Sequence, residues 1–144
     1  MGAVIVLCRA LHCYWGASKA GVLDLLLSEI NFSPNVEGII SLNFFSTVIS
    51  QIVSNVPLTM LIIPLIKYAK SNLLWISLAA GSTLGGNATL IGAVANLIVA
   101  EEADKKGVKI SFKEFTKTGI IVTILTILVS ILILTIEYEL GLLV

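Results

Sequence analysis

Three long stretches of the sequence carry no charged side chain, and they set the first expectation for the fold. They cover residues 38–66, 72–100 and 119–136. Uncharged apolar runs of about 18 residues or more are typical of membrane-spanning segments. The pattern therefore predicts an all-α integral membrane protein.

The N-terminal part has a different pattern. An apolar run over residues 1–17 is interrupted by Arg9 and is barely long enough to cross a bilayer, so we expect a short or truncated span. Residues 20–30 place apolar and polar positions on different sides of a helix, which predicts a helix lying at the membrane interface. A turn over residues 31–35 leads into the first uncharged run.

The run over residues 38–66 is too long for one simple span. As a continuous helix it would measure about 43 Å, whereas the hydrocarbon core is about 30 Å thick. Its centre reads Ser54-Asn-Val-Pro57, and proline removes a backbone donor and disfavours helical geometry before it. Two interpretations remain open: one tilted helix kinked at Pro57, or a re-entrant hairpin over residues 38–68 with arms of about 39–53 and 57–68.

The run over residues 72–100 has a similar interruption. Two apolar halves flank Gly85-Gly-Asn-Ala-Thr89, and each glycine costs about 1 kcal/mol in a helix interior. We expect a broken transmembrane helix here. Residues 101–118 hold five lysines and are expected on the cytoplasmic side, followed by a plain transmembrane helix over residues 119–136. This topology puts Glu37 and residues 67–71 outside, so a hairpin would enter from the external face.

Composition narrows the class further. The chain of 144 residues is 57% hydrophobic and 12% charged, against about 25% charged in soluble domains. Its net charge of zero gives no reason to expect nucleic-acid binding. The two cysteines and the single histidine match no metal or redox spacing. We expect a protein that is not an enzyme and has no cofactor, in contact with the lipid bilayer as a multi-pass protein of the cell membrane.

The polar centres are the candidate site. Broken helices persist at membrane depth where they are buried in protein or line a cavity, and their ends can bind ions. We expect Asn87 and Thr89 to cap the second half of the broken helix, and the carbonyl groups near Gly85, Gly86 and Asn87 to hold a coupling Na⁺. The candidate substrate- and ion-binding residues are Ser54, Asn55, Gly85, Gly86, Asn87, Thr89 and Asn96.

Packing is the competing interpretation of the same residues. Gly81, Gly85, Gly86 and Gly92 could let membrane helices approach closely, and Gln51 could form an inter-helix hydrogen bond. No acidic residue lies within the three uncharged runs, so this segment's own contribution to a site is neutral.

These motifs resemble a known group of proteins. Ser54-Asn-Val-Pro57, Ile63-Pro64 and Leu84-Gly-Gly-Asn-Ala-Thr-Leu-Ile-Gly-Ala-Val-Ala-Asn96 are similar to the C-terminal half of the ion-transporter superfamily. That group includes arsenical-pump membrane proteins, sodium/proton antiporters and citrate or dicarboxylate permeases. The resemblance covers about residues 16–136. It implies one half of an inverted-repeat secondary transporter, with Ser54 and Asn55 at a hairpin tip and Gly85, Gly86 and Asn87 in the unwound loop.

The resemblance also sets the expected function. The chain would be a C-terminal half or fragment of a secondary anion transporter of citrate/dicarboxylate or arsenite type, working by alternating access on a small anionic substrate. Ser54 stands where many antiporter-like members carry an acid, which favours Na⁺-coupled or anion transport. The site needs a second half, from a missing N-terminal repeat, a partner half or another copy of the chain. The alternatives are half of a sodium/proton antiporter and a non-transporting membrane scaffold.

Overall fold

The computed structural model describes residues 32–67 and 71–143, together with single positions before them: Ile5, Cys8, His12, Trp15, Gly16 and Lys19. The expected interfacial helix over residues 20–30 lies outside the described residues, as does most of the expected span over residues 1–17. The elements from residue 32 onward are all helices, as predicted: α3 (Val36–Val53), α4 (Asn55–Ile66), α5 (Asn72–Gly85), α6 (Val94–Lys105) and α7 (Phe112–Glu139).

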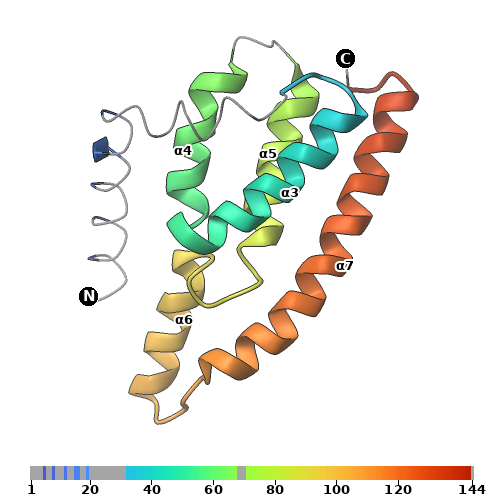
Figure 1. The fold of residues 1–144 in the computed structure, drawn as a ribbon. Coiled ribbons are helices and arrows are strands. Elements are labelled where there is room, and N and C mark those ends of the chain that lie inside the picture. Colours follow the sequence, from blue (N-terminus) through green and yellow to red (C-terminus); the bar gives the residue numbers. More distant parts are fainter. Residues whose placement is uncertain are drawn as a thin grey trace.

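The helices are arranged around the two breaks in the chain. Figure 1 shows α3 running from one end of the bundle to its middle, where α4 turns back toward the starting end. Helix α5 runs in the same direction as α3, and α6 continues beyond the second break to the opposite end. Helix α7 then returns along the whole length of the bundle.

The first break is a single residue. Asn35 caps α3, since its Oδ1 accepts a hydrogen bond from Gly38 N at 2.9 Å. The helix ends at Val53, and α4 begins directly after Ser54, whose φ of 68° and ψ of 160° turn the chain. The chain reverses here and does not continue as one kinked helix. The first arm ends at residue 53 as expected, whereas the second begins at residue 55 and not at the expected residue 57.

Pro57 removes no intrahelical hydrogen bond at this tip. The expected second arm begins at Pro57, whereas in the structure Pro57 is the third residue of α4. The first backbone N–H groups of a helix have no intrahelical acceptor, so a residue without an N–H group is tolerated in this turn. Helix formation therefore resumes two residues earlier than the position of Pro57 predicts.

Two apolar clusters hold the bundle together. The larger one joins α3, α4 and α5 through fully buried side chains: Leu42, Leu58, Ile62, Ile66, Leu74 and Leu78. The smaller one joins α3, α5 and α7 through Ile39, Leu73 and Leu134. Helix α5 contributes to both clusters, so it is the central element of the described bundle.

Helix α5 crosses α3 at very short range. A Cβ atom at Gly85 would lie 2.6 Å from Thr47 Cα, and one at Gly81 would lie 2.9 Å from Asn43 Cα. Cβ atoms do not approach other carbon atoms so closely, so the crossing requires glycine. The packing interpretation of these two glycines is therefore confirmed. Close helix approach through small residues is typical of membrane bundles.

The second break is longer than the sequence suggested. Helix α5 ends at Gly85 and α6 begins at Val94, so residues 86–93 form a loop. We had expected the second half to start near Leu90. The loop is held by its own hydrogen bonds, such as Ala88 N to Gly85 O at 3.0 Å and Gly92 N to Thr89 O at 3.2 Å.

Helix α7 is the longest element. Its 28 residues extend beyond the expected 119–136 at both ends and correspond to about 42 Å of helix, more than a hydrocarbon core of about 30 Å requires. Among the described residues, α3 and α7 are long and apolar enough to cross a membrane. Because 17% of the apolar window of α7 is buried, most of this helix faces away from the bundle.

Candidate functional site

The two helix breaks lie against each other. Asn55 N, at the start of α4, donates a hydrogen bond to Gly92 O in the loop between α5 and α6, at 3.2 Å. This backbone contact joins the tip of the α3–α4 turn to the interrupted helix. The polar residues that are far apart in the sequence therefore form one site.

Four helix ends meet at this site. The C-termini of α3 and α5 bring partial negative charge, and the N-termini of α4 and α6 bring partial positive charge. Neither N-terminus has a side-chain cap. Three backbone N–H groups there, those of Val56, Val94 and Ala95, donate to no acceptor among the described residues. Free N–H groups at helix N-termini are suited to binding an anion or a hydroxylated species.

Gln51 connects the tip to the loop through its side-chain amide. Its Nε2 donates to Gly85 O at 2.8 Å and to Thr47 O at 2.9 Å, and lies 2.8 Å from Ser50 Oγ. Its Oε1 accepts a hydrogen bond from Thr89 Oγ1 at 3.0 Å. Both ends of one amide are thus used, one on α3 and α5 and the other on the loop.

Asn96 closes the loop from the other side. It lies in the first turn of α6, and its Nδ2 donates to Gly86 O at 2.9 Å and to Thr89 O at 3.1 Å. Thr89 Oγ1 also accepts a hydrogen bond from Gly92 N at 3.1 Å. The expectation that Asn87 and Thr89 cap the resumed helix is therefore wrong: the Thr89 hydroxyl binds Gln51 and Gly92, and the N-cap of α6 is Ala93.

Ser54 is strained and buried. It is the one non-glycine residue with positive φ among those described, and only 7% of its surface is exposed. Its Oγ atom is buried and has no hydrogen-bond partner among the described residues. Strained residues cost on the order of 1–3 kcal/mol and cluster at binding sites. Ser54 therefore offers an uncommitted hydroxyl group beside the N-terminus of α4.

Asn87 faces a different side of the loop. It is exposed, makes no side-chain hydrogen bond to the described part of the chain, and lines a pocket of 410 Å³ with Phe115, Thr118, Gly119 and Val122 of α7. Gly119 lets α7 pack against the loop, because a Cβ atom there would overlap the carbonyl oxygen of Asn87. The amide of Asn87 is thus available to a ligand between the loop and α7.

The carbonyl groups of the expected Na⁺ site accept hydrogen bonds. Gly85 O accepts from Gln51 Nε2 and from Ala88 N, and Gly86 O accepts from Asn96 Nδ2. A cation at these two oxygens would have to share them with the amide donors or displace those donors. Sodium coordination here stays a prediction.

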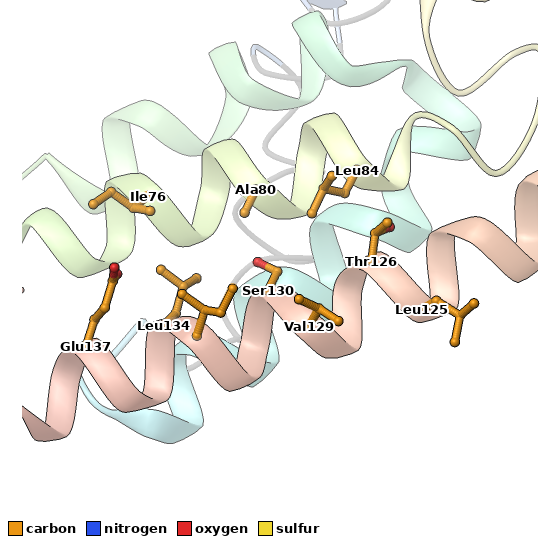
Figure 2. A pocket seen from close by; sticks show the side chains of 10 residues that line it. Ile76, Ala80, Leu84, Leu125, Thr126, Val129, Ser130, Leu134 and Glu137 are labelled. Atoms are coloured by element: carbon orange, nitrogen blue, oxygen red, sulfur yellow. The ribbon is translucent and has the colours of Figure 1, made fainter.

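Another pocket lies between α5 and α7. It is a groove of 560 Å³, lined mainly by aliphatic side chains. Figure 2 shows Ile76, Ala80 and Leu84 of α5 opposite α7, with Glu137 directed toward α5 at one end. Its apolar lining offers few polar groups to orient a ligand, whereas small-molecule sites use several placed polar groups. The helix breaks are therefore the better candidate site.

The structure brings most of the sequence-predicted residues to one place, and their role in binding stays a prediction. Asn55, Gly85, Gly86, Thr89 and Asn96 are joined there by the hydrogen bonds described above, and Ser54 lies directly before Asn55, while Asn87 lines the pocket against α7. Gln51 had been assigned to inter-helix packing, and Gly119 had not been considered. The signal for Gln51 was available, since it is the only glutamine of the sequence and lies three residues before the break.

Comparisons with known proteins identify the family of this chain. The family model described as arsenical pump membrane protein matches residues 3–138. A Mycobacterium leprae protein named 46 kDa membrane protein is 36% identical over 101 residues, which cover 65% of this chain and 24% of the relative. A Dictyostelium discoideum protein named for a transporter of arsB type is 42% identical over 98 residues, 67% of this chain and 17% of the relative.

A relative with lower identity matches a larger share of the chain. The human P protein is 31% identical over 114 residues, 74% of this chain and 13% of the relative. The chain thus spans about a quarter or less of the length of these curated relatives. No solved structure matches. Because the family model covers nearly the whole chain, this membrane protein belongs to the arsenical pump membrane protein family.

Proposed function

We propose that the chain forms one inverted-repeat half of a secondary active transporter that moves an arsenite-type oxyanion by alternating access. The observation that carries this proposal is the hydrogen bond from Asn55 N to Gly92 O, which places two uncapped helix N-termini beside each other. Interrupted helices that meet in this way are a common way to build substrate sites in secondary transporters. The family membership supports arsenite over citrate or a dicarboxylate.

The site would recognise its substrate through hydrogen bonds. The two cysteines of the sequence, at positions 8 and 13, precede both helix breaks, so the breaks hold no thiol. The available groups are the Ser54 hydroxyl, the Asn55 and Asn87 amides and the free N–H groups of α4 and α6. These groups suit the oxygen atoms of an oxyanion, and the carboxylate oxygens of citrate are the second candidate.

The remaining features complete the proposal. Helices α3 and α4 would form a re-entrant hairpin in the cell membrane that enters from outside. Residues 101–118 would lie on the cytoplasmic side, although they are not all loop as expected, because α6 extends to Lys105 and α7 begins at Phe112. A second repeat, in the same polypeptide, in a partner chain or in another copy, would complete the site. No ionisable side chain lies in residues 38–66 or 72–100, so the coupling ion would be Na⁺ near Gly85 and Gly86, or a proton carried by an acid of that second repeat.

The test uses the complete gene product containing this chain, reconstituted in proteoliposomes. We expect saturable arsenite transport that citrate and succinate do not inhibit, driven by an imposed Na⁺ or pH gradient. Asn87→Ala should abolish transport without lowering thermal stability, whereas Asn72→Ala, at an exposed position of α5, should leave transport unchanged. Na⁺/H⁺ exchange without arsenite transport would support the antiporter alternative. Absence of both activities would support the scaffold alternative.

A further inference from the structure

We infer that Gln51 is the positioning residue that holds the loop over residues 86–93 against the α3–α4 tip and thereby sets the shape of the site. The inference rests on the proposed function for its meaning in transport, but the structural role can be tested independently. It assigns a site function to a side chain that sequence analysis had placed in helix packing.

The hydrogen bonds of Gln51 join α3, α5 and the loop over residues 86–93. Nε2 binds α3 through Thr47 O and α5 through Gly85 O, and Oε1 binds the loop through the hydroxyl of Thr89. That hydroxyl in turn accepts from Gly92 N, and Gly92 O accepts from Asn55 N at the start of α4. A continuous chain of hydrogen bonds thus runs from α3 through the loop to α4.

Space around the amide is closely filled. A Cβ atom on Gly92 would lie 2.7 Å from Gln51 Oε1, so the loop packs directly onto this oxygen. Nε2 has two hydrogen atoms but lies within 2.9 Å of three oxygen atoms, those of Thr47, Ser50 and Gly85. The position therefore requires a donor at one end and an acceptor at the other, which a glutamine amide supplies.

Two substitutions separate hydrogen bonding from packing. Gln51→Met keeps a side chain of similar length but loses every hydrogen bond. Gln51→Glu keeps the shape and loses the N–H donors at neutral pH, while its protonated form at low pH can donate one hydrogen bond to Gly85 O or Thr47 O.

The surroundings of position 51 make the pH response specific. No charged, histidine, cysteine or tyrosine side chain occurs on the described parts of α3, α4, α5 or the loop within residues 38–66 and 72–100. The α7 side chains that share a pocket with Gln51 are Ile120, Thr123 and Ile124. The charged residues in the first part of α7 are Lys113, Glu114 and Lys117, and all three precede Gly119 in the sequence.

The experiment is hydrogen–deuterium exchange on the purified complete protein in nanodiscs, with each variant compared with wild type at the same pH. We expect Gln51→Met to raise the exchange of residues 86–92 and of Asn55 about tenfold, as the loss of a buried hydrogen bond implies. Gln51→Glu should do the same at pH 8 and return toward wild type at pH 5. Thr89→Val should give part of the effect, and Thr126→Val, whose hydroxyl binds within α7, should give none.

Two outcomes would overturn the inference. One is wild-type protection of residues 86–92 in both Gln51→Met and Thr89→Val. The other is a Gln51→Glu variant whose exchange does not depend on pH relative to wild type. In transport assays we expect Gln51→Met to raise KM more than it lowers the maximal rate. If the exchange data agree with the inference but the wild-type protein transports nothing, the proposed function is rejected and the structural role of Gln51 stands.

Discussion

Asn55 and Gly92 are joined by a backbone hydrogen bond of 3.2 Å that connects the tip of one helical turn to the break in another helix. The contact uses no side chain, so many sequences could form it. The residues around it decide what it holds: Gln51 and Asn96 fix the loop, and Ser54 and Asn87 present uncommitted polar groups.

The topology can be tested by cysteine labelling in a variant without Cys8 and Cys13. Glu37 is in the first turn of α3 and Lys67 is the C-cap of α4, so both belong to the same end of the bundle, because α4 returns to the end where α3 starts. We expect Glu37→Cys and Lys67→Cys to react with a membrane-impermeant maleimide from outside, and Lys109→Cys to react from inside. Labelling of positions 37 and 67 from opposite faces would rule out the re-entrant hairpin.

The strain at Ser54 predicts an unusual response to substitution. Glycine adopts φ of 68° without steric cost, so Ser54→Gly should raise Tm slightly. Ser54→Val places a β-branched side chain in the same conformation and should lower stability by roughly 1–3 kcal/mol. Thermal unfolding in detergent measures both. Equal tolerance of valine and glycine would show that the backbone here is not constrained.

The crossing of α3 and α5 should be intolerant of a methyl group. Gly85→Ala places a Cβ atom 2.6 Å from Thr47 Cα, and overpacking of this kind costs about 1–3 kcal/mol. The matched control is Gly16→Ala, since a Cβ atom there would meet no atom of the described residues within 4 Å. A drop in Tm for both variants alike would mean that the effect is not due to the crossing.

Loss of Asn96 should loosen the loop. Its amide holds Gly86 O and Thr89 O, so Asn96→Ala leaves two carbonyl groups without this donor and should cost about 1–3 kcal/mol. Asn72→Ala, at an exposed position, should stay within about 0.5 kcal/mol of wild type. We expect limited proteolysis to cut within residues 86–93 in the first variant only. Equal cleavage in both variants would contradict the role of Asn96.

The sequence predicted which segments are interrupted but not where helices start and stop. Glycine, asparagine and proline revealed both breaks because they disfavour helical geometry locally. The start of α7 at Phe112, seven residues before the uncharged run, was missed because hydropathy reports the thickness of the bilayer and not the extent of helical hydrogen bonding. The start of α6 at Val94 was missed because Leu90 and Ile91 are apolar yet lie in the loop.

Site residues were predictable to the extent that their role is local. The polarity of Ser54, Asn55 and Asn96 beside helix breaks was visible in the sequence. The role of Gln51 depends on Gly85 and Thr89, which are 34 and 38 residues away along the chain. The sequence also did not show that Asn55 and Asn87 face different partners. Asn87 lines a pocket with α7, whereas the backbone of Asn55 binds the loop.

The reversal between α3 and α4 depends on one pair of backbone torsion angles, those of Ser54. A turn of one residue has little conformational freedom, because α3 ends directly before it and α4 begins directly after it. Displacement of the tip therefore requires α3 and α4 to move together, because no flexible connection between them can bend. We expect the tip to be rigid, so its position should change only when the tilt of α3 and α4 changes.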